Sequence, residues 1–242
     1  MSKMYEALQQ AKGDRQALRK PTFVDPARVG VAVRLGLETE MLGLYRALDN
    51  VFPGLNQKVI LFLGAKEGEG TSTVVSNLAR VAAERLNRKV AVLDTDTLHP
   101  TQHRLFGVSP VIGWDDVLRG TEPAEKALYR TNGNGLWVVP VSSARAGTVQ
   151  VIDAPGMEGF FGALRERFDL VLIDCAPATA FPDSIALSRK ADGMVLVIEA
   201  ESTRWPVAET ACQQVTKAGG KVIGIVFNKR RYYIPEFVYK WL

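Results

Sequence analysis

The sequence is short of the features that mark membrane, secreted and metal-cluster proteins. It has two cysteines, Cys175 and Cys212, and two histidines among 242 residues, too few for a disulfide framework or a metal cluster. No uninterrupted apolar stretch is longer than Val59 to Leu63, whereas crossing a bilayer takes ~20 apolar residues. Residues 1–10 lack the apolar segment of a signal peptide. We therefore expect a cytoplasmic protein.

Strong charge of one sign is also lacking. The net charge is +4 and the isoelectric point is near 9.1, but the basic residues are spread along the chain apart from Lys229, Arg230 and Arg231. A dispersed excess of this size is typical of a solvated surface. We expect no nucleic-acid partner.

What is present is an alternation of short apolar runs with helical patterns, beginning at Lys58. Runs that are apolar throughout indicate parallel strands covered on both faces, joined by helical crossovers. The sequence predicts an α/β fold with a doubly wound, mainly parallel sheet. The expected strands are Val59–Leu63, Val90–Leu93, Leu136–Val139, Leu170–Ile173, Met194–Ile198 and Val222–Phe227, with helices at Thr73–Leu86, Gly159–Arg167, Asp183–Arg189 and Pro206–Lys217.

Three segments follow from this pattern. Residues 1–36 predict a short amphipathic helix and a linker that contains Pro21 and Pro26. Residues 37–228 form the α/β domain, which begins with a predicted helix over Glu38–Val51 that ends at Pro53 and Gly54. Residues 229–242 form a C-terminal tail that contains tyrosines.

A glycine-bearing turn joins the first strand to the helix that starts near Thr73. A loop that feeds a helix N-terminus directs backbone N–H groups and the positive end of the helix dipole at one point, which favours an anion. Against the phosphate-loop pattern GxxxxGK(S/T), the turn keeps the last glycine and the magnesium-binding hydroxyl but has Ala65 for the first glycine and threonine for the lysine. The predicted phosphate contacts are Gly68, Glu69, Gly70, Thr71, Ser72 and Thr73.

The missing lysine is the main departure in this loop. A lysine there places a full positive charge against the β- and γ-phosphates, whereas Thr71 offers a hydroxyl. Losing one charge-assisted contact weakens binding by roughly 1.5 to 3 kcal/mol, and the chemical step suffers more because negative charge develops in the transition state. We expect nucleotide binding to outlast catalysis.

Carboxylates follow two of the expected strands. Asp94 and Asp96 come after Val90–Leu93, and Asp174 follows Leu170–Ile173. Doubly wound folds place ligands at the carboxyl ends of their strands, and Mg²⁺ takes hard oxygen ligands together with phosphates and water. We predict a magnesium site formed by Ser72, Asp96 and Asp174, with Asp94 and Asp96 as catalytic residues.

Over Glu38 to Asn228 the order of motifs resembles the cytoplasmic kinase domain of bacterial tyrosine kinases, a branch of the P-loop ATPases that also holds division-site and partition ATPases. The motifs are GEGTST, DxDxxxP, HRLFG followed by DVLRG, FDLVLIDCAP and ADGMVLVIEA. The resemblance implies ATP or ADP and Mg²⁺ as ligands. The residues that differ from the family's motifs are at positions that carry the chemistry. Thr71 replaces lysine, Glu67 and Ala176 replace prolines, and Leu98 and His99 occupy basic positions.

Other features of such kinases are only partly present in this sequence. Their ring-forming helix carries Glu, Arg and Arg at three-residue spacing, and this chain has Glu40, Gly43 and Arg46 there. Their tails hold many phosphorylated tyrosines; here the candidate phosphoacceptors are Tyr232, Tyr233 and Tyr239. In the partition branch a second lysine precedes the loop lysine by five positions and reaches across a dimer. Lys66 occupies that position and is a candidate substitute cation.

Three functions remain open. The first is a pseudokinase that regulates or assembles a polysaccharide synthesis and export system, held at the inner membrane by a membrane co-polymerase or its cytoplasmic tail, as a homo-oligomer or together with an intact kinase. The second is an active tyrosine autokinase in which Lys66 replaces the loop lysine. The third is a partition-type ATPase acting as a positional switch. The departures at the chemical positions favour the first.

Overall fold

The computed structural model describes residues 37–132, 134–142, 156–180 and 182–230. The predicted N-terminal helix and linker at residues 1–36, and the candidate phosphoacceptors Tyr232, Tyr233 and Tyr239, lie outside these residues. None of the described helices is long and apolar enough to cross a membrane.

A seven-stranded sheet forms the centre of the described domain. Its order is β3-β4-β2-β5-β1-β6-β7, and every neighbouring pair is parallel except β3 with β4. The prediction of a doubly wound, mainly parallel sheet is confirmed. The strands are β1 (Lys58–Gly64), β2 (Val90–Asp94), β3 (Tyr129–Arg130), β4 (Leu136–Val139), β5 (Leu170–Asp174), β6 (Gly193–Glu199) and β7 (Val222–Asn228).

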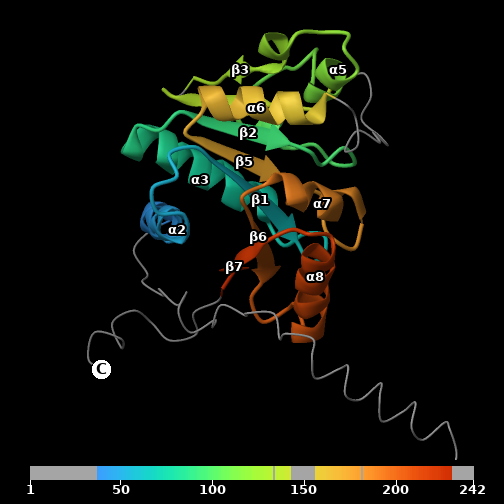
Figure 1. Cartoon of the computed structure of the whole chain (residues 1–242). Coiled ribbons are helices and arrows are strands. Elements are labelled where there is room, and N and C mark those ends of the chain that lie inside the picture. The colour runs from blue at the N-terminus through green and yellow to red at the C-terminus, as the bar shows by residue number, and fades with distance from the viewer. Residues whose placement is uncertain (1–36, 133, 143–155, 181, 231–242) are drawn as a thin grey trace, which may run out of the picture. The chain divides into compact units, whose positions relative to one another are not determined.

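Helices cover both faces of the sheet (Figure 1). Helices α2 (Leu37–Val51) and α3 (Thr71–Leu86) pack on one face, and α6 (Met157–Arg167), α7 (Pro182–Leu187) and α8 (Trp205–Lys217) pack on the other. The shorter helices are α4 (Gln102–Leu105), α5 (Trp114–Leu118), η2 (Ala124–Ala127) and η4 (Ser188–Lys190).

The central strands are buried because each of their faces packs against a separate apolar cluster. In β1, Ile60 and Phe62 face α2 and α3, while Leu61 and Leu63 face the α6, α7 and α8 side. Burial on both faces disfavours polar residues along the middle of a strand. This arrangement explains why the strand sequences are apolar throughout rather than alternating.

The predicted element bounds differ from the structure mainly at ends and in short pieces. Helix α3 begins at Thr71 rather than Thr73, because it starts directly after the left-handed Gly70. The predicted helix over Asp183–Arg189 is divided into α7 and the single-turn η4. Strand β3, α4 and α5 were not predicted, since two to five residues are too few to show a period.

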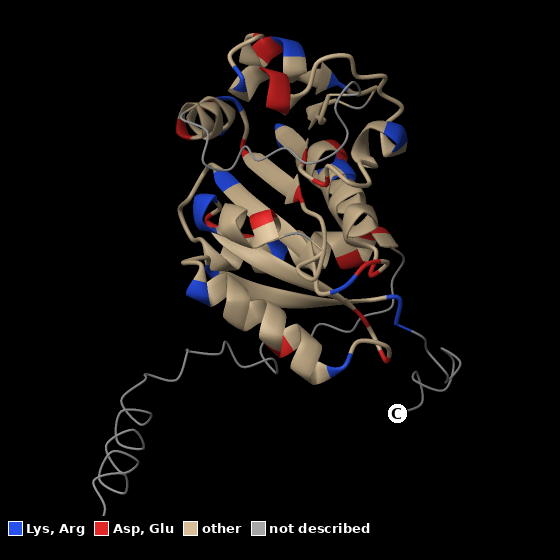
Figure 2. Ribbon diagram, turned by 90° about the vertical axis from the view of Figure 1, so that its right-hand side faces the viewer, with Lys and Arg blue, Asp and Glu red and all other residues tan. Residues whose placement is uncertain are grey.

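Charged residues lie mostly on the helices and loops, with both signs interspersed, whereas the strands are largely uncharged (Figure 2). Two carboxylates at strand ends are exceptions: the side chains of Asp94 and Asp174 are completely buried. Both residues lie at the carboxyl edge of the sheet, where the candidate site is.

Candidate functional site

The loop between β1 and α3 has the geometry of an anion cradle. Gly68 and Gly70 have φ angles of 83° and 85°, a left-handed conformation that glycine adopts at little cost. A Cβ atom on Gly70 would lie 2.4 Å from Nδ2 of Asn228. The loop leads straight into the sixteen residues of α3, whose first N–H groups and dipole favour a negative ligand.

Glu69 is folded beneath this loop. Its side chain is buried, and Oε2 accepts a hydrogen bond from the backbone N–H of Lys66 at 3.0 Å. Oε1 accepts one from the hydroxyl of Thr203 at 2.5 Å, in the turn between β6 and α8. Glu69 therefore braces the loop with its carboxylate. Its predicted contact with phosphate would have to come from its backbone N–H.

Thr71 begins α3 and is also buried. Its Oγ1 lies 3.0 Å from the point where a Cβ on Gly64 would stand, so the hydroxyl is directed toward the end of β1. Ser72 and Thr73 follow in the first turn of α3. The lysine position thus contributes a hydroxyl inside the loop and no charge.

Lys66 does not face the loop interior. Its Nζ donates a hydrogen bond to Oγ of Ser202 at 3.1 Å, on the exposed side of the turn between β6 and α8. Within one chain the ammonium is therefore bonded to this turn. The predicted role of Lys66 across a subunit interface stays a prediction.

The Asp94 carboxylate is held by backbone groups of the following loop. Its Oδ2 accepts hydrogen bonds from the N–H groups of Thr101 at 3.0 Å and Gln102 at 2.9 Å. Burial raises the pKa of Asp94 well above its usual value, and the charge of Asp174 raises it further, while the two N–H groups oppose the shift. These contacts fix the Asp94 carboxyl group at the edge of the sheet, and its predicted catalytic role stays a prediction.

Asp174 lies beside Asp94 in the register of β5 and β2. Its Oδ2 accepts a hydrogen bond from Nε2 of Gln102 at 2.7 Å, and its buried Oδ1 has no partner within the described residues. Burial raises the pKa of Asp174 to about 6, with the amide of Gln102 and the nearby hydroxyl of Ser72 opposing the rise. A buried carboxylate oxygen with no partner is a candidate ligand for a cation or its water.

The Asp96 carboxylate stabilises a turn in the structure. Its Oδ1 accepts hydrogen bonds from the N–H groups of Leu98 at 3.1 Å and His99 at 2.9 Å, which closes the turn after β2. Among the described residues no group of three or more His, Cys, Asp and Glu is arranged to hold a metal. A catalytic or metal-binding role for Asp96 therefore stays a prediction.

Nucleotide phosphates and Mg²⁺ fit these residues. The glycine turn and the α3 N-terminus provide donors for phosphate, and Ser72 and the free oxygen of Asp174 provide hard oxygen ligands. Mg²⁺ needs only one or two protein ligands when phosphates and water complete its shell. The absence of a three-carboxylate cluster in the described chain is consistent with such a site.

Several residues at the site were missed from the sequence. Gln102 links two elements, because its Nε2 donates to the carbonyl of Ser72 at 3.0 Å as well as to Asp174. Trp114 donates from Nε1 to the carbonyl of Asp94 at 2.8 Å. Asn228 and Lys229 bind the phosphate loop from the end of β7. Only the last two had a signal, since the carboxyl end of every parallel strand faces this edge.

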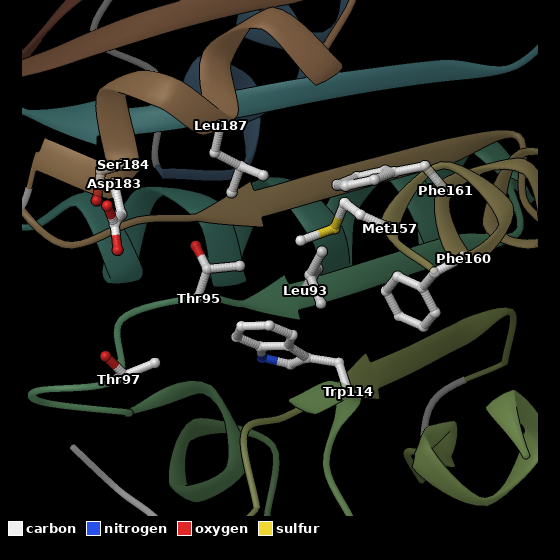
Figure 3. A pocket seen from close by; sticks show the side chains of 10 residues that line it. All are labelled: Leu93, Thr95, Thr97, Trp114, Met157, Phe160, Phe161, Asp183, Ser184 and Leu187. Carbon is white, nitrogen blue, oxygen red and sulfur yellow. The ribbon is translucent and has the colours of Figure 1, made fainter. Parts of the chain in front are cut away.

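A narrow pocket lies behind the carboxylates, on the face of the sheet covered by α6 and α7 (Figure 3). Hydroxyl and carboxyl groups line the end near the β2 terminus, and the rest is apolar. The ring of Trp114 lines the pocket while its N–H holds the carbonyl of Asp94, so pocket and site share one side chain. The lining residues are Leu93, Thr95, Thr97, Trp114, Met157, Phe160, Phe161, Asp183, Ser184 and Leu187.

Comparison with known proteins agrees with this geometry. The ParA family model, described as NUBPL iron-transfer P-loop NTPase, matches residues 56–239. Curated relatives are bacterial tyrosine kinases. The tyrosine-protein kinase YwqD of Bacillus subtilis is 28% identical over 174 residues, which are 72% of this chain and 73% of YwqD.

Solved structures give the same assignment. The VpsO kinase domain has a TM-score of 0.69 at 25% identity and covers 80% of this chain and 96% of its own. The septum site-determining protein MinD of Pyrococcus horikoshii, complexed with Mg-ADP, has a TM-score of 0.58 at 25% identity, covering 75% of each chain. With its phosphate loop, strand-end carboxylates and matching model, the chain belongs to the ParA family of P-loop NTPases.

Proposed function

We propose that this protein is a degenerate kinase of the bacterial tyrosine-kinase type, which binds ATP or ADP with Mg²⁺ weakly and acts mainly in regulation or assembly. The observation that carries the proposal is Thr71, an uncharged residue at the lysine position of an otherwise well-formed loop. The loop conformation, the buried carboxylates and the sheet around them support nucleotide binding.

Binding is supported by groups that need no lysine. Backbone N–H groups at the start of α3 are directed at the loop, and the glycines allow close approach of a phosphate. Ser72 and Asp174 would hold magnesium, which supplies charge neutralisation of the phosphates when bound. Asp94 is held by the backbone N–H groups of Thr101 and Gln102, which need no ligand.

Weak catalysis is supported by the charge balance. Phosphoryl transfer depends on positive groups placed against the developing charge, and Thr71 provides none. Asp94 and Asp174 add two buried carboxylates to the same edge. The basic positions after Asp96 are occupied by Leu98, which is exposed, and by His99.

The cellular setting that we propose comes from the resemblance to kinases of capsule and exopolysaccharide biosynthesis. The chain would work on the cytoplasmic side, at the inner membrane, through a membrane polysaccharide co-polymerase or its cytoplasmic tail. It would form a homo-oligomer or join an intact kinase, and Tyr232, Tyr233 and Tyr239 would be the acceptors for phosphorylation. The names of the curated relatives support the kinase part of this proposal.

Two alternatives have specific support. An active autokinase needs another cation, and Lys66, at the position of the partition-type lysine, is exposed enough to reach a second subunit. A partition-type switch is supported by the likeness to MinD. The DVLRG segment and the tail tyrosines favour the kinase type over the switch.

Incubation of the full chain with labelled ATP and Mg²⁺ tests the proposal. We expect measurable bound nucleotide and little or no phosphotyrosine. Strong phosphotyrosine that is lost in Lys66→Ala or Asp94→Ala would establish the active autokinase instead. No bound nucleotide at any accessible concentration would leave a scaffold without nucleotide chemistry.

A further inference from the structure

Two consecutive side chains at the end of β7 reach the phosphate loop. Nδ2 of Asn228 donates a hydrogen bond to the carbonyl of Glu69 at 2.8 Å, and Nζ of Lys229 donates one to the carbonyl of Gly68 at 2.6 Å. In an extended strand, successive side chains point to opposite faces. Both can reach the same loop only if the backbone turns between them.

The backbone turns at Lys229, whose φ angle is 54°. Lysine rarely adopts this left-handed conformation, and such strain persists where surrounding contacts hold it. Here the contacts are the carbonyl of Gly68 and the carboxylate of Glu199, which lies 3.3 Å from Nζ. The fold thus uses an unfavourable conformation to place one ammonium group on the phosphate loop.

This loop lacks a charge of its own at position 71. The Lys229 ammonium bonds a loop carbonyl, and its Cε lies 3.9 Å from the position of a Cβ on Gly70. Lys229 and Glu199 are both partly exposed, with side-chain exposures of 47% and 32%, so their ion pair is weak enough to exchange for another anion. Lys66, by contrast, bonds the hydroxyl of Ser202 in the turn between β6 and α8.

We propose that Lys229 supplies the positive charge that binds the phosphates of a nucleoside di- or triphosphate, in place of the missing lysine. The inference rests on the proposed nucleotide binding. A phosphate chain entering the loop would draw the ammonium from Glu199, while the left-handed turn and Asn228 keep the side chain beside Gly68. The charge would come from the residue that follows β7 in the same chain rather than from a second subunit.

Titration calorimetry of the full chain with Mg-ADP and Mg-ATP tests this assignment. We expect Lys229→Gln to weaken binding about tenfold or more, the size of one charge-assisted contact, and Lys229→Arg to stay within about threefold of the wild type. Lys217→Gln removes the same charge from the exposed end of α8 and should change nothing. The weakening should be larger for ATP than for AMP and should shrink at high salt.

The same substitution in the Thr71→Lys background separates charge from loop shape. With a lysine restored at position 71, Lys229→Gln should weaken binding less than about threefold, because the charge is no longer needed. An equal loss in both backgrounds, for AMP as for ATP, would mean that Lys229 only braces the loop and would overturn the inference.

The remaining outcomes of the binding measurements separate the Lys229 assignment from the proposed nucleotide function. If the wild type binds nucleotide and Lys229→Gln binds equally well, only the Lys229 assignment fails; a loss in Lys66→Gln instead would move the role to Lys66. If the wild type binds neither ADP nor ATP, the proposed nucleotide function fails and the assignment with it. Thermal melting of each variant checks that the fold is retained.

Discussion

The phosphate loop and the paired ends of β2 and β5 meet at one edge of the sheet but are built differently. The loop is held from outside, by Asn228 and Lys229 on its carbonyls and by Thr203 on Glu69. The strand ends are held from inside, where Gln102 bonds both Asp94 and Asp174. The charged groups are divided accordingly: the cations are at the surface and the carboxylates are buried.

This difference shows where the site departs from the phosphate-loop pattern. The acidic half keeps Asp94 and Asp174 buried side by side, with a free oxygen on Asp174. The loop half keeps its left-handed glycines but has Thr71 where the pattern has a lysine. We expect two buried carboxylates without a buried cation to make the site more dependent on Mg²⁺ than a lysine-bearing site.

Removing the charge of Asp174 should have the largest effect on stability. The folded-state pKa of about 6 stands above the 3.8 of an ordinary aspartate, so the ionised carboxylate is a cost of folding at neutral pH. We expect Asp174→Asn, without Mg²⁺, to raise the free energy of unfolding by about 2 to 3 kcal/mol at pH 7.5. Urea unfolding measures the change.

The sign of the pH dependence checks this explanation. A raised carboxyl pKa favours the folded state below the unfolded value and costs stability as pH rises through the folded value. The advantage of Asp174→Asn should therefore be full above pH 6 and nearly absent at pH 4. A gain that is equal at both pH values would point to altered hydrogen bonding with Gln102 instead of charge.

Gly70→Ala should disrupt the phosphate loop between β1 and α3. The new Cβ would displace the Asn228 amide, 2.4 Å away, from the Glu69 carbonyl, and alanine at a φ of 85° is strained. Together these effects should cost about 2 kcal/mol of stability and most nucleotide affinity. Urea unfolding and calorimetry measure both.

Gly68→Ala is the matched control, since its φ is 83° but nothing lies within 4 Å of its Cβ position. It should cost about 1 kcal/mol, from the backbone conformation alone. Equal losses in the two variants would mean that the contact between Asn228 and the loop contributes little.

Much of this fold could be predicted, because long apolar runs and helical periods carry the information. The six long strands and five main helices appear at or within a few residues of their expected positions. Strand β3 was missed because Tyr129 and Arg130 show no apolar run, and α4 was missed because four residues span barely one turn.

The positions of site residues were predictable where motif and strand end coincide, as for Ser72, Asp94 and Asp174. It was not predictable where a neutral side chain acts through its position in space, as Gln102 does between Ser72 and Asp174. The direction of Lys66 and the turn at Lys229 were equally hidden, since each depends on a contact more than a hundred residues away in the chain.

Restoring the loop lysine should give the phosphate loop a charged group of its own, as the ends of β2 and β5 already have. Thr71→Lys should tighten Mg-ADP binding by about tenfold or more, or roughly 1.4 kcal/mol, by returning a charge to the inside of the loop. Calorimetry measures affinity, and phosphotyrosine detection measures any regained kinase activity. Thr71→Ser, which keeps the hydroxyl, is the control. If affinity and activity both stay unchanged, the site is altered elsewhere as well, and Leu98 and His99 are the next positions to restore.

The smallest predicted effect concerns α2, far in sequence from both halves. Gly43 occupies the middle of this helix with open space around its Cβ position, where glycine costs roughly 0.5 to 1 kcal/mol relative to alanine. Gly43→Ala and Gly43→Arg should both raise stability by about 0.7 kcal/mol, measured by urea unfolding. Only Gly43→Arg restores the spacing of Glu40, an arginine and Arg46 that ring-forming kinases share.

Light scattering after gel filtration then separates assembly from helix stability. We expect Gly43→Arg to shift the protein toward a larger oligomer, whereas Gly43→Ala should leave its mass unchanged. If both variants change the mass equally, a stiffer helix rather than the arginine drives assembly. If neither does, contacts other than position 43 limit assembly.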